Sequence, residues 1–197
     1  MSTELELPLF PLHAVLFPEG NLALRIFEQR YLDMATACLK RQEPFGVCLI
    51  AEGDEVGHTA TPHELGTLAQ ITAWDMAQLG VLQVTVQGSQ RFRILDRQAT
   101  GAGLLRGRVA VMPPEPVEKI PHHCARLIPL LRAVVEDLGE RGPPAPHRFF
   151  DAGWVGYRWC EVLPIPLLAR QKLLELEDNI SRLEIIARYL EQRGLLR

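Results

Sequence analysis

The stretch LPLFPLHAVLFPEGNLALRIFEQRYLDM, residues 7–34, decides the fold of the first half of the chain. It is rich in leucine, contains no serine and is interrupted by Pro8, Pro11 and Pro18. These prolines break any helix long enough to cross a bilayer, which takes about 20 apolar residues. A secretory signal needs a basic start, whereas residues 1–6 carry two glutamates and no lysine or arginine. We therefore expect the stretch to belong to the fold itself.

Short apolar runs separated by turn residues are typical of strands, and they fill the first half of the chain. Residues 22–27 alternate apolar and polar side chains, and a helix is expected to follow from Glu28 to Arg41 because apolar residues recur there at helical spacing. The other predicted strands are residues 5–10, 45–51, 65–74, 80–88, 91–95 and 104–112, with an exposed loop over 53–64. Six or seven short strands with one early helix favour an antiparallel barrel or half-barrel.

The pattern changes at MPPEPVEKIP, residues 112–121, where four prolines in ten residues predict a linker. Everything after it is predicted to be helical. We expect apolar faces formed by Leu127, Leu131, Val134 and Leu138, by Phe150, Trp154, Val155, Trp159 and Val162, and by Ile180, Leu183, Ala187 and Leu190. Asp178 is expected to cap the last helix, and Gly194 to end it. The chain is thus divided into a β-rich body, residues 1–115, and a helical bundle, residues 116–197.

The cysteine usage and the net charge limit the classes of protein that are possible. Cys38, Cys48, Cys124 and Cys160 are widely separated, which favours buried free thiols in a reducing cytoplasm over a metal ribbon or a disulfide framework. A net charge of -3 argues against a dedicated nucleic-acid binder, which usually has a basic face.

The distribution of charge is uneven. Residues 42–90 contain no lysine or arginine, whereas residues 88–108 carry five arginines against the single Asp96. The arginines are Arg91, Arg93, Arg97, Arg106 and Arg108. One interpretation is that neighbouring strands neutralise each other across a sheet. The alternative is a basic strip that binds an anion.

Motifs for catalysis and metal binding are missing from the sequence. No GxxxxGK[ST] loop for binding phosphates occurs. Ser2 lies near the start of the chain, Ser89 in an expected hairpin turn and Ser181 in an expected helix, so no serine is in a nucleophile elbow. His122, His123 and Cys124, with His58 and His63 as further partners, have metal-ligand side chains. Neighbours on a helix point about 100° apart, so we expect solvated imidazoles and a buried thiol instead. No cofactor is expected.

The opening stretch closely resembles the start of the N-terminal substrate-binding domain of Lon proteases, in the stand-alone form found in many bacteria. The blocks FGVCLIAEG, LGTLAQI, QGSQRFRIL and LPIPLLARQKLLELEDNISRLEII match the same family in order, at residues 45–53, 65–71, 87–95 and 163–186. The resemblance implies an α+β fold, with a PUA-like β-pseudobarrel that contains one inserted helix and precedes a C-terminal α-helical bundle, packed as one unit.

The same resemblance implies a function in binding unfolded or specific polypeptides. In Lon this domain precedes an ATPase and a Ser/Lys protease domain, and motifs for both are missing here. We therefore expect a non-enzymatic binding or adaptor module without a membrane segment. The alternative is a PUA-like binder of nucleic acid or a small ligand that uses the strip from Arg91 to Arg108.

Four residues at the end of the opening stretch are candidate binding residues. Arg25 lies on the polar side of the strand, and Glu28, Arg30 and Tyr31 begin the helix, so all four are expected at one strand-to-helix junction. They form either an internal ion-pair network or the wall of a peptide groove, where arginine forks and a tyrosine ring suit peptide recognition. Arg91 and Arg93 are the candidates on the basic strip.

Overall fold

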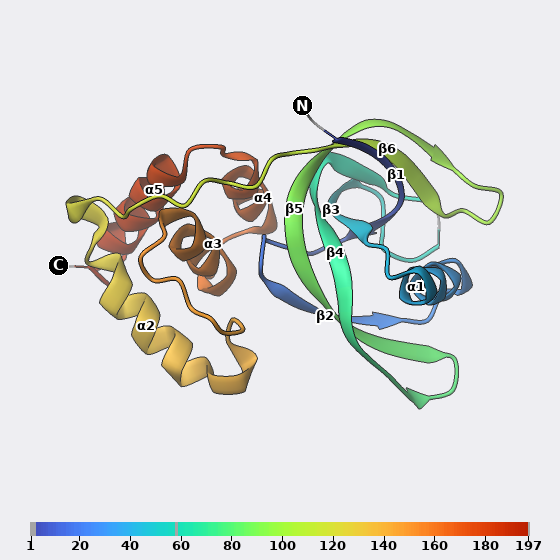
Figure 1. Cartoon of the computed structure of the whole chain (residues 1–197), viewed down its shortest axis with the longest axis horizontal. Coiled ribbons are helices and arrows are strands. Elements are labelled where there is room, and N and C mark those ends of the chain that lie inside the picture. Colours follow the sequence, from blue (N-terminus) through green and yellow to red (C-terminus); the bar gives the residue numbers. More distant parts are fainter. Residues whose placement is uncertain (1–2, 58, 197) are drawn as a thin grey trace. The chain divides into compact units, whose positions relative to one another are not determined.

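The computed structural model describes residues 3–57 and 59–196, so Ser2 and His58 lie outside the described residues. The chain divides into two compact units, Met1–Pro114 and Glu115–Arg197 (Figure 1). The first unit contains all six strands and one helix, and the second contains the remaining helices of the described chain. An α+β fold of this kind, with the early helix between strands, confirms the fold class predicted from sequence.

Unit 1 is a closed ring of five strands with a sixth strand at its margin. The strands are β1 (Thr3–Leu12), β2 (Asn21–Ile26), β3 (Phe45–Glu52), β4 (Thr61–Gln78), β5 (Val81–Ala99) and β6 (Leu105–Val111). Their order is β2-β5-β4-β3-β1-β6, and an additional β5–β6 pairing closes the ring. Only β1 and β3 pair in parallel. Among the described strands, β2 pairs with β5 alone and therefore ends the sheet.

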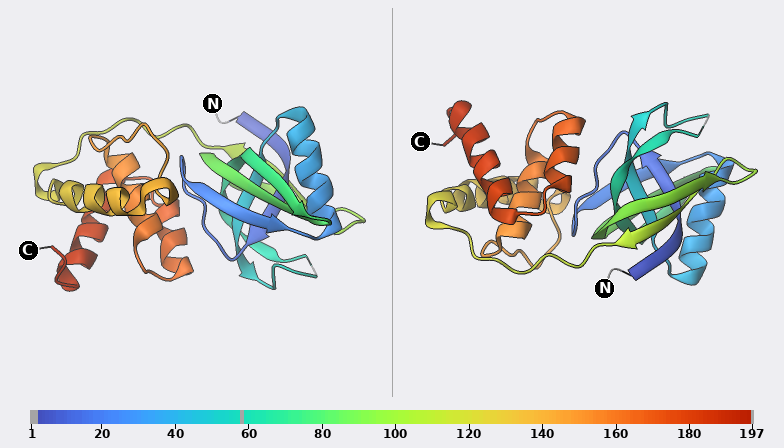
Figure 2. Two further views of the ribbon diagram at one scale, coloured as in Figure 1. Left: turned by 90° about the horizontal axis from the view of Figure 1, so that it is seen from below. Right: turned by 90° about the horizontal axis from the view of Figure 1, so that it is seen from above.

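Helix α1 (Gln29–Arg41) connects β2 to β3 and covers one opening of the barrel (Figures 1 and 2). Its buried face includes Tyr31, Met34, Ala35 and Cys38, which confirms the predicted stripe. The helix ends at Gln42, which adopts a left-handed conformation with φ 55°, shortly before Pro44. The buried side chains of α1 pack with Phe45 and Val47 of β3 in one cluster of the barrel core.

The predicted break between residues 88 and 91 is wrong, because β5 runs through it without a turn. Gly88 is needed there for close approach and not for a hairpin, since a Cβ at Gly88 would clash with the carbonyl oxygen of Phe17. Glu19 N donates to Gly88 O and Gly88 N donates to Gly20 O, both at 2.8 Å. Residues 61–64, predicted as loop, are the first residues of β4.

Unit 2 consists of four α-helices and two short 3₁₀ turns. The helices are α2 (Leu127–Leu138), α3 (Ala152–Val162), α4 (Leu167–Glu175) and α5 (Asn179–Gln192), with 3₁₀ turns η1 (His122–Cys124) and η2 (Gly139–Arg141). As predicted, Asp178 caps α5 by accepting a hydrogen bond from Ser181 N, and Trp154 and Trp159 are buried.

Five predicted core positions of unit 2 are not buried: Val134, Leu138, Phe150, Val162 and Ile180. Leu127, Leu131 and Val135 form the buried stripe of α2 in steps of four, so Val135 replaces Val134. Phe150 is 63 % exposed because it precedes the first turn of α3 and does not lie on the buried face of that helix. In α5 the buried face starts at Asn179, and Ile180 beside it is only half-buried.

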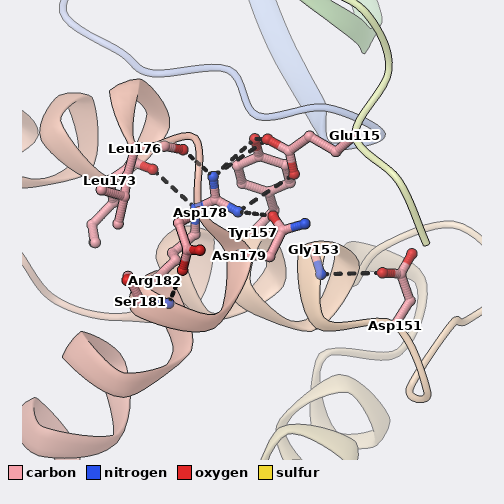
Figure 3. A network of polar contacts seen from close by, with 10 residues as sticks. All are labelled: Glu115, Asp151, Gly153, Tyr157, Leu173, Leu176, Asp178, Asn179, Ser181 and Arg182. Carbon is pink, nitrogen blue, oxygen red and sulfur yellow. Dashed lines mark hydrogen bonds and ion pairs between the residues drawn. The ribbon is translucent and has the colours of Figure 1, made fainter. Parts of the chain in front are cut away.

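A buried polar network fixes the start of unit 2 to its last helix (Figure 3). Arg182 is fully buried, and its guanidinium donates to Asn179 Oδ1 at 2.6 Å and through Nε to the Leu173 carbonyl at 3.0 Å. The same group lies 3.4 Å from Glu115 Oε1 and stacks 4.1 Å from the centroid of the Tyr157 ring. The Tyr157 hydroxyl in turn donates to Glu115. A buried charge needs such partners, so this network is structural.

Within the described part of the chain, no helix is both long enough and apolar enough to cross a membrane.

Candidate functional site

A groove of about 300 Å³ opens beside β2 in unit 1. It is formed by the end of β1 with the segment after it, by β2 from Leu22 onward, by the start of α1 with the two residues before it, and by the loop after β3. Its described lining residues are Phe10, Leu12, Ala14, Leu22, Ala23, Leu24, Arg25, Ile26, Phe27, Glu28, Tyr31, Glu55 and Val56. Only three of these carry a charge, so the groove is mainly apolar.

The floor of the groove is a pair of stacked aromatic rings. Phe10 and Tyr31 have ring centroids 4.1 Å apart, and each side chain is less than a tenth exposed. Burial raises the pKa of Tyr31 above its ordinary value of 10.0, so the hydroxyl stays protonated in neutral solution. The floor therefore offers an uncharged aromatic surface to a bound group.

The rim of the groove holds two exposed apolar side chains. Phe27, directly after β2, is 53 % exposed, and Val56, in the loop after β3, is 55 % exposed. Single exposed apolar residues are common, but two that face the same groove form a surface that is favourable to cover. Half-buried Leu22 and Leu24 extend this surface along β2.

The charged residues of the groove hold the surrounding loop in place. Glu28 Oε2 lies 3.0 Å from Arg30 Nη2 and accepts a hydrogen bond from Gly57 N at 3.5 Å. Glu55 accepts a hydrogen bond from His13 N. The loop over residues 53–57 is thereby tied both to the start of α1 and to the segment that follows β1.

The structure brings three of the four junction candidates to the groove. Arg25, Glu28 and Tyr31 line it, whereas Arg30 is not among the described lining residues. Arg30 is buried, donates to the Gly103 carbonyl at 2.9 Å and lies 4.6 Å from the centroid of the Tyr31 ring. Arg30 therefore connects α1 to the turn between β5 and β6.

The basic strip lies elsewhere, on β5 and β6, and one of its arginines, Arg108, faces carboxylates. Arg108 lies opposite Glu6 on β1 and Asp96 on β5, and its Nη1 is 3.0 Å from Glu4 Oε2. Arg91 is only 5 % exposed, whereas Arg93 is exposed. At Arg108 this arrangement favours neutralisation across the sheet over anion binding. The acidic partners of Arg108 come from β1 and β5 and not from residues 42–90.

The histidine cluster is placed as expected. His122 and His123 are exposed on η1 and the Cys124 thiol is buried, and His123 Nε2 lies 2.9 Å from Glu184 Oε1. Among the described residues, no group of three or more histidine, cysteine, aspartate or glutamate side chains could hold a metal ion.

Sequence reasoning missed the apolar part of the site. Phe27 and Val56 were not candidates, although the alternation of residues 22–27 places Phe27 on the exposed side with Arg25. A second missed feature is the β4–β5 hairpin, which extends beyond the barrel in Figure 1. It exposes Trp74, Met76 and Leu79 by 61 %, 48 % and 95 %. For Phe27 the signal was an apolar side chain at a position that alternation assigns to solvent.

Comparison with known proteins identifies the class of this fold. The family model for the ATP-dependent protease La (LON) substrate-binding domain matches residues 6–192. The chain therefore belongs to this family, which confirms the resemblance drawn from the opening stretch.

Individual relatives agree with this assignment. The chain is 32 % identical to a Lon N-terminal domain protein from Xanthomonas campestris, whose crystal structure superposes with a TM-score of 0.79 and covers 94 % of this chain and 98 % of that one. The N-terminal domain of a Lon protease from Mycobacterium avium complex shows the same fold. It is 13 % identical, and its structure superposes with a TM-score of 0.64 over 94 % of this chain and 98 % of that one.

Curated relatives are longer. Lon protease 2 of Herpetosiphon aurantiacus is 27 % identical over 94 % of this chain and 24 % of its own length. Protein cereblon of Danio rerio is 28 % identical over 54 % of this chain and 25 % of its own length. The chain thus spans about a quarter of the length of these relatives.

Proposed function

We propose that this protein binds non-native segments of polypeptide in the groove of unit 1 and catalyses no reaction itself. The observation that carries the proposal is the exposure of Phe27 and Val56 on the rim of a mainly apolar groove, in a chain that belongs to a substrate-binding family. Folded proteins bury most of their large apolar side chains, so exposed ones on a ligand distinguish a non-native chain from a native one.

The composition of the groove supports apolar ligands with an occasional basic residue. Its described lining carries two glutamates and one arginine, a formal excess of one negative charge. A second hollow, of about 390 Å³ between β1 and α1, has five charged residues in its lining and is less suited to apolar side chains. Because the first groove is shallow and buries little area, we expect affinities in the micromolar range.

In this proposal the protein acts as an adaptor or holding module, and any unfolding or cleavage of the bound chain requires an activity supplied by another domain or partner. Four buried free thiols support a location in the cytoplasm, where such thiols stay reduced.

The test compares one model protein in two states. A carboxymethylated, permanently unfolded protein and its native disulfide-bonded form are labelled and titrated with the purified chain. We expect the unfolded form to bind with a dissociation constant in the micromolar range and the native form to show no saturable binding. Equal binding of both forms, or of neither, contradicts the proposal.

A further inference from the structure

We infer that the free edge of β2 receives an extended segment of the bound polypeptide as an additional strand of the sheet. This inference rests on the proposed function and adds the mode of recognition: the main chain of the ligand bonds to β2 while its side chains enter the groove.

The edge of β2 is unpaired along its whole length. β2 pairs with β5 over residues 21–26 without a register shift, and no other described strand pairs with it. Among the described residues, the backbone groups of residues 21–27 have no hydrogen-bond partner beyond β5. Every second residue of an end strand directs its N–H and C=O away from the sheet, so β2 offers a row of unsatisfied groups. Figure 2, left, shows β2 along the margin of the sheet.

The groove follows this edge. Its lining includes the seven consecutive residues from Leu22 to Glu28, as expected when a strand borders a groove with its backbone as well as its side chains. Phe10 in the floor and Leu12 beyond it, both near the end of β1, also line the groove. β1 pairs with β6 only as far as Leu9, so the flank of residues 10–12 away from β3 also lacks a strand partner in the described part of the chain. The groove therefore lies between two open strand flanks.

Three usual protections of an exposed edge, namely proline, lysine and a bulge, are missing from β2. Natural sheets guard their edges with proline, lysine, bulges or a covering segment. β2 contains neither proline nor lysine and has no bulge against β5. Its one charged residue, Arg25, is turned toward the β4–β5 hairpin, where Nη2 donates to Gln78 Oε1 at 3.3 Å. An unguarded edge beside an apolar groove suits a strand that binds reversibly.

The occupant is an extended peptide of alternating pattern with a basic residue. A helical ligand satisfies its own backbone groups and leaves those of β2 unpaired. In a strand, alternate side chains point to the same face, so every second residue of the ligand meets the apolar side of β2 that Leu22 and Leu24 form. Glu28 and Glu55 supply the carboxylates of this lining; because Glu28 is already paired with Arg30, Glu55 in particular favours a lysine or arginine of the ligand.

The test uses a fluorescent, end-blocked peptide of about ten residues that alternates leucine and threonine and carries one lysine. Two further versions are N-methylated on alternate amides, one at odd positions and one at even positions, which removes the donors from one edge of the peptide at a time. We expect one version to lose at least about tenfold in affinity and the other to stay within about threefold of the parent, because only one edge bonds to β2.

A second experiment uses the same peptide to test the attraction between its lysine and the groove. Glu55→Gln, which keeps the acceptor for His13 N, should weaken binding of the lysine peptide about two- to threefold without affecting a version with norleucine in place of lysine. Glu64→Gln, an exposed position of β4 outside the groove lining, is the matched control and should change neither affinity.

The outcomes separate the inference from the proposed function. If the parent peptide binds and both methylated versions bind equally well, strand addition is wrong although polypeptide binding stands. If the peptide binds only after dissociating a dimer in sedimentation experiments, the edge is occupied by a second copy and the inference is overturned. If neither the peptide nor an unfolded protein binds, the proposed function fails as well.

Discussion

The rings of Phe10 and Tyr31 stack with centroids 4.1 Å apart and an interplanar angle of 28°. One ring comes from β1 and the other from α1, so the stack joins the helix to the barrel. Both residues belong to the core cluster of unit 1 and also form the floor of the groove. The stability of the barrel and the shape of the candidate site are therefore coupled at this pair.

Truncation of Tyr31 should destabilise unit 1. Tyr31→Ala removes a buried aromatic ring and is expected to lower the free energy of unfolding by about 3–5 kcal/mol. Tyr31→Phe keeps the stack with Phe10 and should stay within about 1 kcal/mol of wild type. Urea unfolding followed by circular dichroism measures both values. Equal stability of the two variants would show that the stack contributes nothing.

The network around Arg182 should be essential to unit 2. Arg182→Ala leaves Glu115 without its buried partner, and loss of one member of a buried ion pair costs about 3–5 kcal/mol. Arg188→Ala, at an exposed position of the same helix, should change stability by less than about 0.5 kcal/mol. Thermal melts of both variants test this contrast, and a wild-type melting temperature for Arg182→Ala would contradict it.

Stability should fall as the pH rises between about 4.5 and about 7 because of Glu161. Burial raises the pKa of this carboxyl from 4.5 to about 7, although Arg158 and Arg170 oppose the shift. In that window the folded state binds more protons than the unfolded state, so raising the pH favours unfolding. The effect is on the order of 2 kcal/mol. Glu161→Gln should remove this part of the pH dependence in urea titrations, whereas a constant difference from wild type at every pH would rule it out.

The thiols should be unreactive in the native protein. All four cysteines are free and buried, and burial raises the pKa of Cys48 and Cys160 to about 12. Because the thiolate is the reactive form, a disulfide reagent near neutral pH should modify native protein slowly and denatured protein rapidly. Rapid modification of the native protein would indicate that a cysteine lies at an open surface.

Local patterns in the sequence predicted the elements whose formation depends on neighbours along the chain. The alternation of residues 22–27, the stripe of α1 and the cap at Asp178 are of this kind, and all three are present. The continuity of β5 could not be predicted in this way. Residues 88–90 have the composition of a turn, and they stay in the strand because the segment at Phe17 packs against Gly88 from a distant part of the chain.

The same distinction applies to the candidate site. Arg25, Glu28 and Tyr31 are neighbours in sequence and were predicted to meet, and they line one groove. Phe10 is brought to the groove by the pairing of β1 with β3. Val56 is brought there by the contacts of the loop that follows β3. No pattern within a single segment contains that information, so the apolar half of the groove became apparent only in three dimensions.

The most direct test of polypeptide binding in this groove is a matched pair of rim variants. Phe27→Ser removes an exposed apolar side chain of the groove, and Leu95→Ser removes one, 43 % exposed, from β5 outside the groove lining. Fluorescence anisotropy with a permanently unfolded protein gives the affinity of each variant at matched folded fraction. We predict that Phe27→Ser weakens binding about tenfold or more, since burial of a large apolar side chain contributes about 1.5–3 kcal/mol, and that Leu95→Ser binds like wild type. Equal affinities for the two variants would contradict the assignment of the groove.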